Sequence, residues 1–177
     1  MAQRTNSFAS KAIGEVGGVN VVRALLAGLI GTVAITILMY AGPVMGFPRM
    51  DIATMLGTMF VSDPSAAFIP GMVMHFMIGV ILALGYAFLF AGWLPGHPWM
   101  RGALYGLVPF LMANAIVMPM MGLIHPMVLS GMMPAPGFFL VGMGTVMAPI
   151  GRLLGHLVYG AVVGAIYGQV GCNCVQQ

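Results

Sequence analysis

Four long apolar stretches constrain this chain more than any other feature of its sequence. They cover residues 21–42, 69–93, 102–122 and 150–170 and hold almost no charged side chain. A helix that crosses the hydrocarbon core of a membrane needs about 20 mainly apolar residues, and each stretch is long enough. Apolar and polar residues do not alternate within them, as they do in the strands of a membrane barrel. The sequence therefore predicts an all-α, polytopic membrane protein with four transmembrane helices.

Composition excludes two other classes of protein. Of the 177 residues, 60% are hydrophobic and only 5% are charged, whereas a soluble domain is about one quarter charged. Disordered chains combine low hydrophobicity with high net charge, which is the reverse of this composition. The formal charge of +3 reflects a scarcity of acids rather than a clustered basic face. We therefore expect the lipid bilayer as a partner, and no nucleic acid.

The chain divides into two tails and two helical units. We expect an N-terminal cytoplasmic tail over 1–20, one two-helix unit over 21–92, another over 99–170, and a C-terminal tail over 171–177. Equal intervals separate two sets of four residues: His75, Gly79, Ala83, Tyr86 and His156, Gly160, Gly164, Tyr167. The pattern predicts a tandem duplication of a two-helix unit, with its pseudo-twofold axis along the membrane normal.

Basic residues indicate the orientation, because loops on the cytoplasmic side are enriched in Lys and Arg. Arg4, Lys11, Arg23 and Arg101 fall on the side of the N-terminus, and Arg49 and Arg152 fall opposite. We therefore expect both termini in the cytoplasm, where the thiols of Cys172 and Cys174 stay reduced. Two thiols supply half of a tetrahedral metal site, so this pair is either a soft-metal ligand or an inert tail.

Two connections are more than simple turns. Asp51 can cap a short interfacial helix near 51–61 that lies along the membrane surface. Its apolar residues recur at helical spacing and form a candidate partner-docking face: Ile52, Met55, Leu56, Met59 and Phe60. That face either covers the mouth of the bundle or docks a partner. The connection 123–149 is apolar but broken by prolines and glycines, so it must pack on protein or lie at the interface.

His75 and His156 are the candidate cofactor-binding residues. Both fall about two turns inside equivalent helices, and a polar side chain inside a membrane helix usually faces the protein interior. Three interpretations stay open. The imidazoles are axial ligands of a haem b or a chlorin, or they form hydrogen bonds where helices cross, or they border a site for a ligand or lipid.

Rows of small residues follow each histidine at intervals of four. They are candidate helix-packing residues: Gly79, Ala83, Ala87 and Gly160, Gly164, Gly168. Small side chains let helix backbones approach closely. If the two rows face each other along their length, a haem does not fit between the histidines unless the helices splay there.

No arrangement of catalytic groups is visible, and we expect a protein that is not an enzyme. The chain has three carboxylates, all outside the spans, and Lys11 is its one lysine, so neither a carboxylate dyad nor a phosphate loop is available. The 19 methionines suit Cu(I) but also fill irregular gaps between helices. We predict no metal site, and copper handling stays an alternative.

Several short motifs carry a resemblance: PRMDIATMLG, MHFMIG, PWMRGALYGL, MPMMG and GHLVYG. Together they resemble an uncharacterised family of small bacterial four-helix integral membrane proteins, known as a domain of unknown function. The likeness covers about 21–168. It implies a four-helix bundle in a bacterial inner or intracytoplasmic membrane, and no activity.

The leading functional hypothesis is a non-enzymatic accessory or assembly subunit of a larger respiratory or photosynthetic membrane complex. Small-residue faces suited to packing and the absence of catalytic groups motivate it. Its partners are then other membrane-protein subunits. The alternatives are a bis-histidine haem b or chlorin protein that transfers electrons, and a transporter or channel for a small solute or copper. No cofactor follows from the sequence alone.

Overall fold

The computed structural model describes residues 15, 16 and 18–168. It is mostly helical, and four of its helical spans are long and apolar enough to cross a membrane: Val21–Met45, Pro64–Phe90, Pro98–Ile124 and Met147–Tyr167. The prediction of a mainly helical chain with four helices that can span a membrane is thereby confirmed. The second span begins at Pro64 rather than at 69, because Asp63 caps it there and Pro70 is tolerated inside it.

Each span is built from one or more helical elements. The first joins α2 (Val21–Ala41) to the 3-10 turn η1 (Gly42–Met45), and the second joins α4 (Pro64–Gly85) to the π-helix η2 (Tyr86–Phe90). The third comprises α5 (Pro98–Met112), the π-helix η3 (Ala113–Val117) and α6 (Met118–Ile124). The fourth is α8 (Met147–Tyr167). Short helices α3 (Ile52–Gly57), α7 (Pro126–Leu129) and η4 (Phe138–Met143) lie in the connections.

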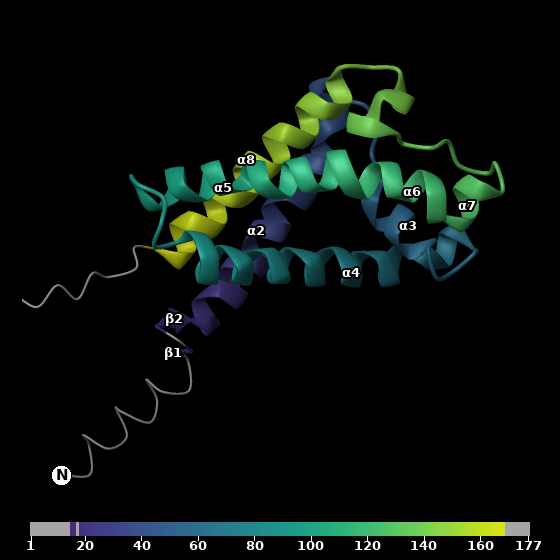
Figure 1. The fold of residues 1–177 in the computed structure, drawn as a ribbon. Helices are drawn as coiled ribbons and strands as arrows, with labels where there is room; N and C mark the ends of the chain where they lie inside the picture. The colour runs from purple at the N-terminus through teal and green to yellow at the C-terminus, as the bar shows by residue number, and fades with distance from the viewer. Residues whose placement is uncertain (1–14, 17, 169–177) are drawn as a thin grey trace, which may run out of the picture.

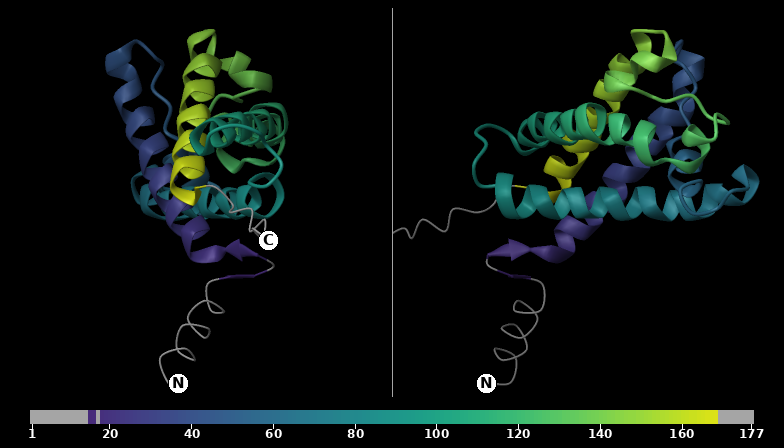
Figure 2. Two further views of the ribbon diagram at one scale, coloured as in Figure 1. Left: turned by 90° about the vertical axis from the view of Figure 1, so that its left-hand side faces the viewer. Right: turned by 45° about the vertical axis from the view of Figure 1, so that its right-hand side comes forward.

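The long helices cross one another obliquely. Helices α2 and α8 run antiparallel and in contact, and their common direction is inclined to that of α4 and α5 (Figures 1 and 2). The first residues of α2 and the last residues of α8 lie at the same end of the bundle (Figure 1). The start of the first span and the end of the fourth span therefore lie on the same side of the bundle.

Glycines set the closest helix contacts. A Cβ atom added to Gly102 of α5 would collide with the Gly160 carbonyl of α8, and one added to Gly160 would collide with the Gly102 carbonyl. Between α2 and α4, a Cβ at Gly28 would lie 2.7 Å from the Cα of Val80. Helix α5 thus packs backbone to backbone on α8, and α2 does so on α4, as small residues allow. The duplication that the sequence suggests stays a prediction.

The short helix α3 packs against α4. Asp51 caps it by accepting from the Thr54 backbone N–H at 2.9 Å, as the sequence predicts. Gly57 lies so close to the backbone of Ala67, and Gly71 so close to that of Ala53, that a Cβ atom at either glycine would collide with it. Its position at the membrane interface stays a prediction.

Two local features depart from a purely helical expectation. Glu15–Val16 and Val19–Asn20 form a short antiparallel ladder just before α2, inside the segment expected to be a tail. In η4, Phe139 and Leu140 have φ of 49° and 59°, which is unfavourable for residues other than glycine. Leu140 is held there by burial against Leu56, Met118 and Ala148. Part of the 123–149 connection therefore packs on protein.

Candidate intramembrane ligand site

A cavity of about 410 Å³ lies between the four spans. Its walls are almost entirely apolar and come from α2, α4, the η3 region and α8. The segment between α2 and α4 closes one side through Phe47, Met50 and Ile52. A volume of this size falls in the range of small-molecule sites, which are typically apolar with a few placed polar groups.

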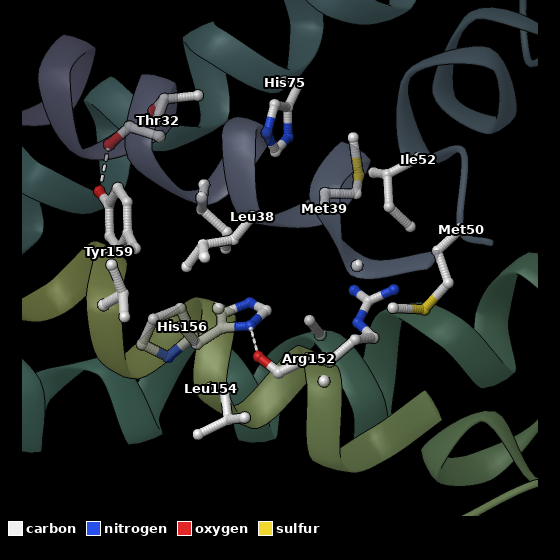
Figure 3. A pocket seen from close by; sticks show the side chains of 18 of the residues that line it. Thr32, Leu38, Met39, Met50, Ile52, His75, Arg152, Leu154, His156 and Tyr159 are labelled. Atoms are coloured by element: carbon white, nitrogen blue, oxygen red, sulfur yellow. Dashed lines mark hydrogen bonds between the residues drawn. The ribbon is translucent and has the colours of Figure 1, made fainter. Parts of the chain in front are cut away.

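Both predicted histidines reach this cavity. His75 projects from α4 and His156 from α8, and their rings point into the space between the helices (Figure 3). His156 Nδ1 lies 2.7 Å from the Arg152 carbonyl, and because a carbonyl only accepts, Nδ1 carries the hydrogen. The Nε2 atom of neutral His156 is then an acceptor. Nε2 of His75 is buried and has no hydrogen-bond partner among the described residues.

Arg152 is the third polar group of the cavity, and the sequence analysis used it only as a sign of orientation. It lies one turn before His156 on α8, and its side chain extends towards Met39 and Met50 (Figure 3). The residue is only 9% exposed. Its Nε atom has no partner among the described residues, and Nη1 faces the thioether of Met118 at 3.7 Å. The sequence contained a signal for this role. Arg152 lies inside a predicted span, and the three acidic residues that could neutralise it all lie outside the spans.

The hydroxyl groups at the cavity wall are already engaged. Tyr159 donates its hydroxyl to the Gly79 carbonyl at 2.5 Å, which ties α8 to α4. Thr32 donates to the Gly28 carbonyl at 2.7 Å. Among the polar side chains that line the cavity, the nitrogens of His75 and Arg152 and the Nε2 atom of His156 therefore remain for a bound molecule.

The two small-residue rows do not face each other. Gly160 and Gly164 pack on α5, whereas Gly79 packs against Thr32 of α2. Ala83 and Ala87 are buried in the core. Gly168 lies beyond the end of α8, with φ of 82° at its C-cap. Because the rows point to different neighbours, they leave the space between the histidines open.

The residues proposed for partner docking lie mostly against the protein. Ile52, Met55 and Leu56 line the cavity, and Met59 packs on the cluster around Leu56. Phe60 is 72% exposed. Of the two uses considered for this face, the contacts favour covering the bundle.

A fully buried histidine that the sequence analysis did not single out lies under α3. His125 Nε2 donates to the Met55 carbonyl at 2.9 Å, and Nδ1 accepts from the Met127 N–H at 3.2 Å. This residue joins the connection after α6 to α3. Its contact with the Met127 N–H is local, whereas the Met55 carbonyl lies 70 residues away in the chain, so the sequence does not show that the ring is buried.

Metal-binding groups are sparse. Within residues 15, 16 and 18–168, no three His, Cys, Asp or Glu side chains gather at one point. Several methionines line the cavity: Met39, Met45, Met50, Met55 and Met118. Cys172 and Cys174 lie outside the described residues.

Comparison with known protein families matches residues 18–173, which is nearly the whole chain. The chain belongs to the family of unknown function DUF6789. No curated protein and no solved structure matches. Membership of DUF6789 agrees with the resemblance to a family of unknown function and supplies no activity. The bacterial origin that the resemblance implies stays a prediction.

Proposed function

We propose that this protein is a non-enzymatic membrane protein that binds a membrane-soluble molecule between its helices. The observation that carries the proposal is the cavity of about 410 Å³ on which His75, Arg152 and His156 converge. Apolar walls favour a hydrocarbon body, and the three nitrogen-bearing side chains favour a polar end. Polar groups inside a membrane protein are costly, and therefore usually mark a pathway or a binding site.

Three residues that line the cavity are also exposed: Ile78, Leu154 and Val158. Because they lie well inside α4 and α8, their exposure favours an opening of the cavity towards the lipid. In a membrane, lipid covers these surfaces, so a molecule dissolved in the bilayer can reach the cavity without passing through water. This opening favours binding or carriage of an amphiphile over conduction of a small ion.

The test is to purify the full chain in mild detergent, extract bound organic molecules and identify them by mass spectrometry. We expect one class of amphiphile at about one per chain. Ala113→Leu fills the cavity wall at η3 and should abolish that signal, whereas Ala165→Leu, on the exposed surface of α8, should leave it unchanged. Equal recovery from both variants would show that the molecule is surface lipid.

A haem b or chlorin protein is a second candidate, because His156 donates Nδ1–H to a carbonyl, which leaves the lone pair of Nε2 for a metal, and His75 lines the same cavity. Metal-ligating histidines commonly make this hydrogen bond. A reduced-minus-oxidised absorption spectrum tests it. A Soret band that disappears in both His75→Ala and His156→Ala would support haem ligation. A colourless protein, purified with haem available, would reject it.

The accessory-subunit hypothesis is compatible with a binding role, but its structural support is reduced. The glycine rows that suggested packing against other subunits pack within the chain, through Gly102, Gly160 and Gly79. Copurification of a foreign subunit in mild detergent remains the measurement that would support it. A transporter for copper is less favoured, because a buried guanidinium repels a cation.

A further inference from the structure

We infer that the molecule bound in this cavity is an amphiphilic anion: its oxyacid head pairs with Arg152, and its hydrocarbon tail extends along the apolar wall towards Leu154 and Val158. This inference rests on the proposed function and adds the charge and the placement of the ligand.

The first step is the state of Arg152. Its guanidinium is always charged in proteins and presents five N–H donors. In the structure it lies nine-tenths buried, with Nε unpartnered among the described residues and Nη1 facing only the sulfur of Met118 at 3.7 Å. A thioether is a weak, uncharged acceptor. The guanidinium therefore retains most of its capacity to bind an anion.

The second step is the absence of an internal counter-ion. The chain has three acidic residues, Glu15, Asp51 and Asp63. Asp51 accepts from Thr54, and Asp63 accepts from Ser65, both at exposed helix caps. Neither Asp51 nor Asp63 forms an ion pair with Arg152 in the part of the chain that the structure describes. A buried ion without a partner is strongly unfavourable, so an anion from outside the chain would satisfy a specific need.

The third step concerns the neighbours of Arg152 in the cavity. His75 Nε2 is buried without a partner and can donate to the same head in its Nε2–H tautomer. His156 Nε2 can accept a hydrogen from a head that keeps one hydroxyl beside its negative charge, as a phosphate monoester monoanion does and a carboxylate does not. Neither imidazole supplies a negative charge. The donor set thus suits an oxyacid and disfavours a free metal cation.

The fourth step is the shape of the site. Arg152 lies five residues into α8, or about 8 Å from its N-terminal end at 1.5 Å per residue. Leu154 and Val158 follow on the same helix, line the cavity and are exposed at its side. A head at Arg152 near the membrane boundary and a tail reaching inward matches the orientation of a lipid in a bilayer. Carboxylate and phosphate heads share this chemistry, and the experiment separates them.

The test uses the full chain, stripped of bound lipid and placed in nanodiscs of phosphatidylcholine, which has no net charge. Three probes with the same chain length are compared by native mass spectrometry: palmitate, hexadecyl phosphate and hexadecan-1-ol. We expect at least one of the acids to bind about tenfold or more tightly than the alcohol, since a hydrogen bond to a charged group is worth that much. The tighter acid identifies the head.

Arg152→Met removes the charge and keeps an apolar side chain in the cavity. It should lower the affinity for the acids to that for the alcohol and leave the affinity for the alcohol unchanged. Arg49→Met is the matched control, because Arg49 is an exposed arginine outside the cavity and its removal should change neither affinity. Alcohol binding also serves as the check that Arg152→Met is folded.

The outcomes separate the inference from the proposed function. Equal affinity of wild type for alcohol and acids overturns the anion inference and keeps the proposed cavity function. Unchanged acid binding by Arg152→Met has the same consequence. If none of the three probes binds and no amphiphile copurifies, both fail. Should Arg152→Met not fold, the comparison of acids with alcohol on wild type alone decides.

Discussion

At the scale of single residues, His125 has the most specific structural role outside the cavity. It is fully buried. Its ring forms one hydrogen bond with the Met55 carbonyl and one with the Met127 N–H, and these two groups belong to segments far apart in the chain. His125→Ala leaves the Met55 carbonyl and the Met127 N–H without this partner. We expect a loss of about 1–3 kcal/mol in the free energy of unfolding.

Thermal unfolding in detergent measures this effect. His97→Ala is the control, because His97 is exposed and makes no side-chain cap at the start of α5. Equal midpoints for the two variants would contradict a structural role for His125.

The sequence predicted only part of this residue-level picture. His75 and His156 stood out because imidazoles are costly inside a membrane helix. Arg152 was used only as a sign of orientation, although its spacing of four residues from His156 was visible in the sequence; its position relative to His75 depends on how α8 and α4 are arranged. The role of His125 could not be identified, because its contact with the Met55 carbonyl depends on the packing of α3, and only its contact with the Met127 N–H is local in sequence.

At the scale of elements, the backbone contact between α5 and α8 predicts that a single added methyl group at this contact lowers the stability of the protein. Gly160→Ala would place its Cβ against the Gly102 carbonyl, so one of the helices must shift. Overpacking of this kind costs about 1–3 kcal/mol. The thermal midpoint in detergent should fall accordingly.

Gly85→Ala in α4 is the matched control. Its added Cβ would lie 3.5 Å from the Tyr105 hydroxyl, an ordinary contact, so the lower backbone entropy of alanine should leave stability equal or higher. If Gly160→Ala were as stable as Gly85→Ala, the close packing of α5 on α8 would be wrong.

We predict that stabilisation of α4 by its N-terminal cap depends on pH. The Ser65 hydroxyl and backbone N–H both donate to Asp63, which lowers the pKa of that carboxyl from its ordinary value of 3.8. A lowered pKa in the folded state means that the cap stabilises α4 above pH 3.8 and loses this effect as the pH falls through the folded pKa.

Asp63→Asn keeps an acceptor at the cap and does not titrate. The difference in thermal midpoint between wild type and Asp63→Asn should therefore change below about pH 4 and stay constant between pH 5 and 8. A constant difference down to pH 2 would show that Asp63 does not titrate with folding.

The element boundaries predicted from the sequence agree with the structure where local chemistry determines them. Asp51 caps α3 and the apolar runs became the four spans, because capping and hydropathy act over a few residues. The ladder at 15–20, the π-helices η2 and η3 and the strained turn at Phe139 and Leu140 were not predicted. The turn depends on contacts with other elements, because Leu140 is buried in one cluster with Leu56 of α3 and Ala148 of α8.

At the scale of the whole molecule, the even number of spans predicts that both ends of the chain emerge on one side. The distribution of arginines predicts that this side is the cytoplasm. Cys172 and Cys174, outside the described residues, provide a test. A membrane-impermeant maleimide should label them in inverted vesicles and not in intact cells, with a Cys172→Ser, Cys174→Ser variant as the blank. Labelling in intact cells would reverse the orientation.

The exposure of Ile78, Leu154 and Val158 at the cavity wall has a consequence for how occupancy is controlled. A ligand that arrives through this opening is already dissolved in the bilayer, so its effective concentration is its mole fraction among lipids. Diluting a suspension of such membranes with buffer leaves the fraction of occupied sites unchanged, because a strongly partitioned amphiphile stays with the lipid. Fusing the same membranes with ligand-free vesicles lowers that fraction, because it dilutes the ligand among more lipids. The protein would therefore sense the composition of its own membrane rather than the content of the surrounding water.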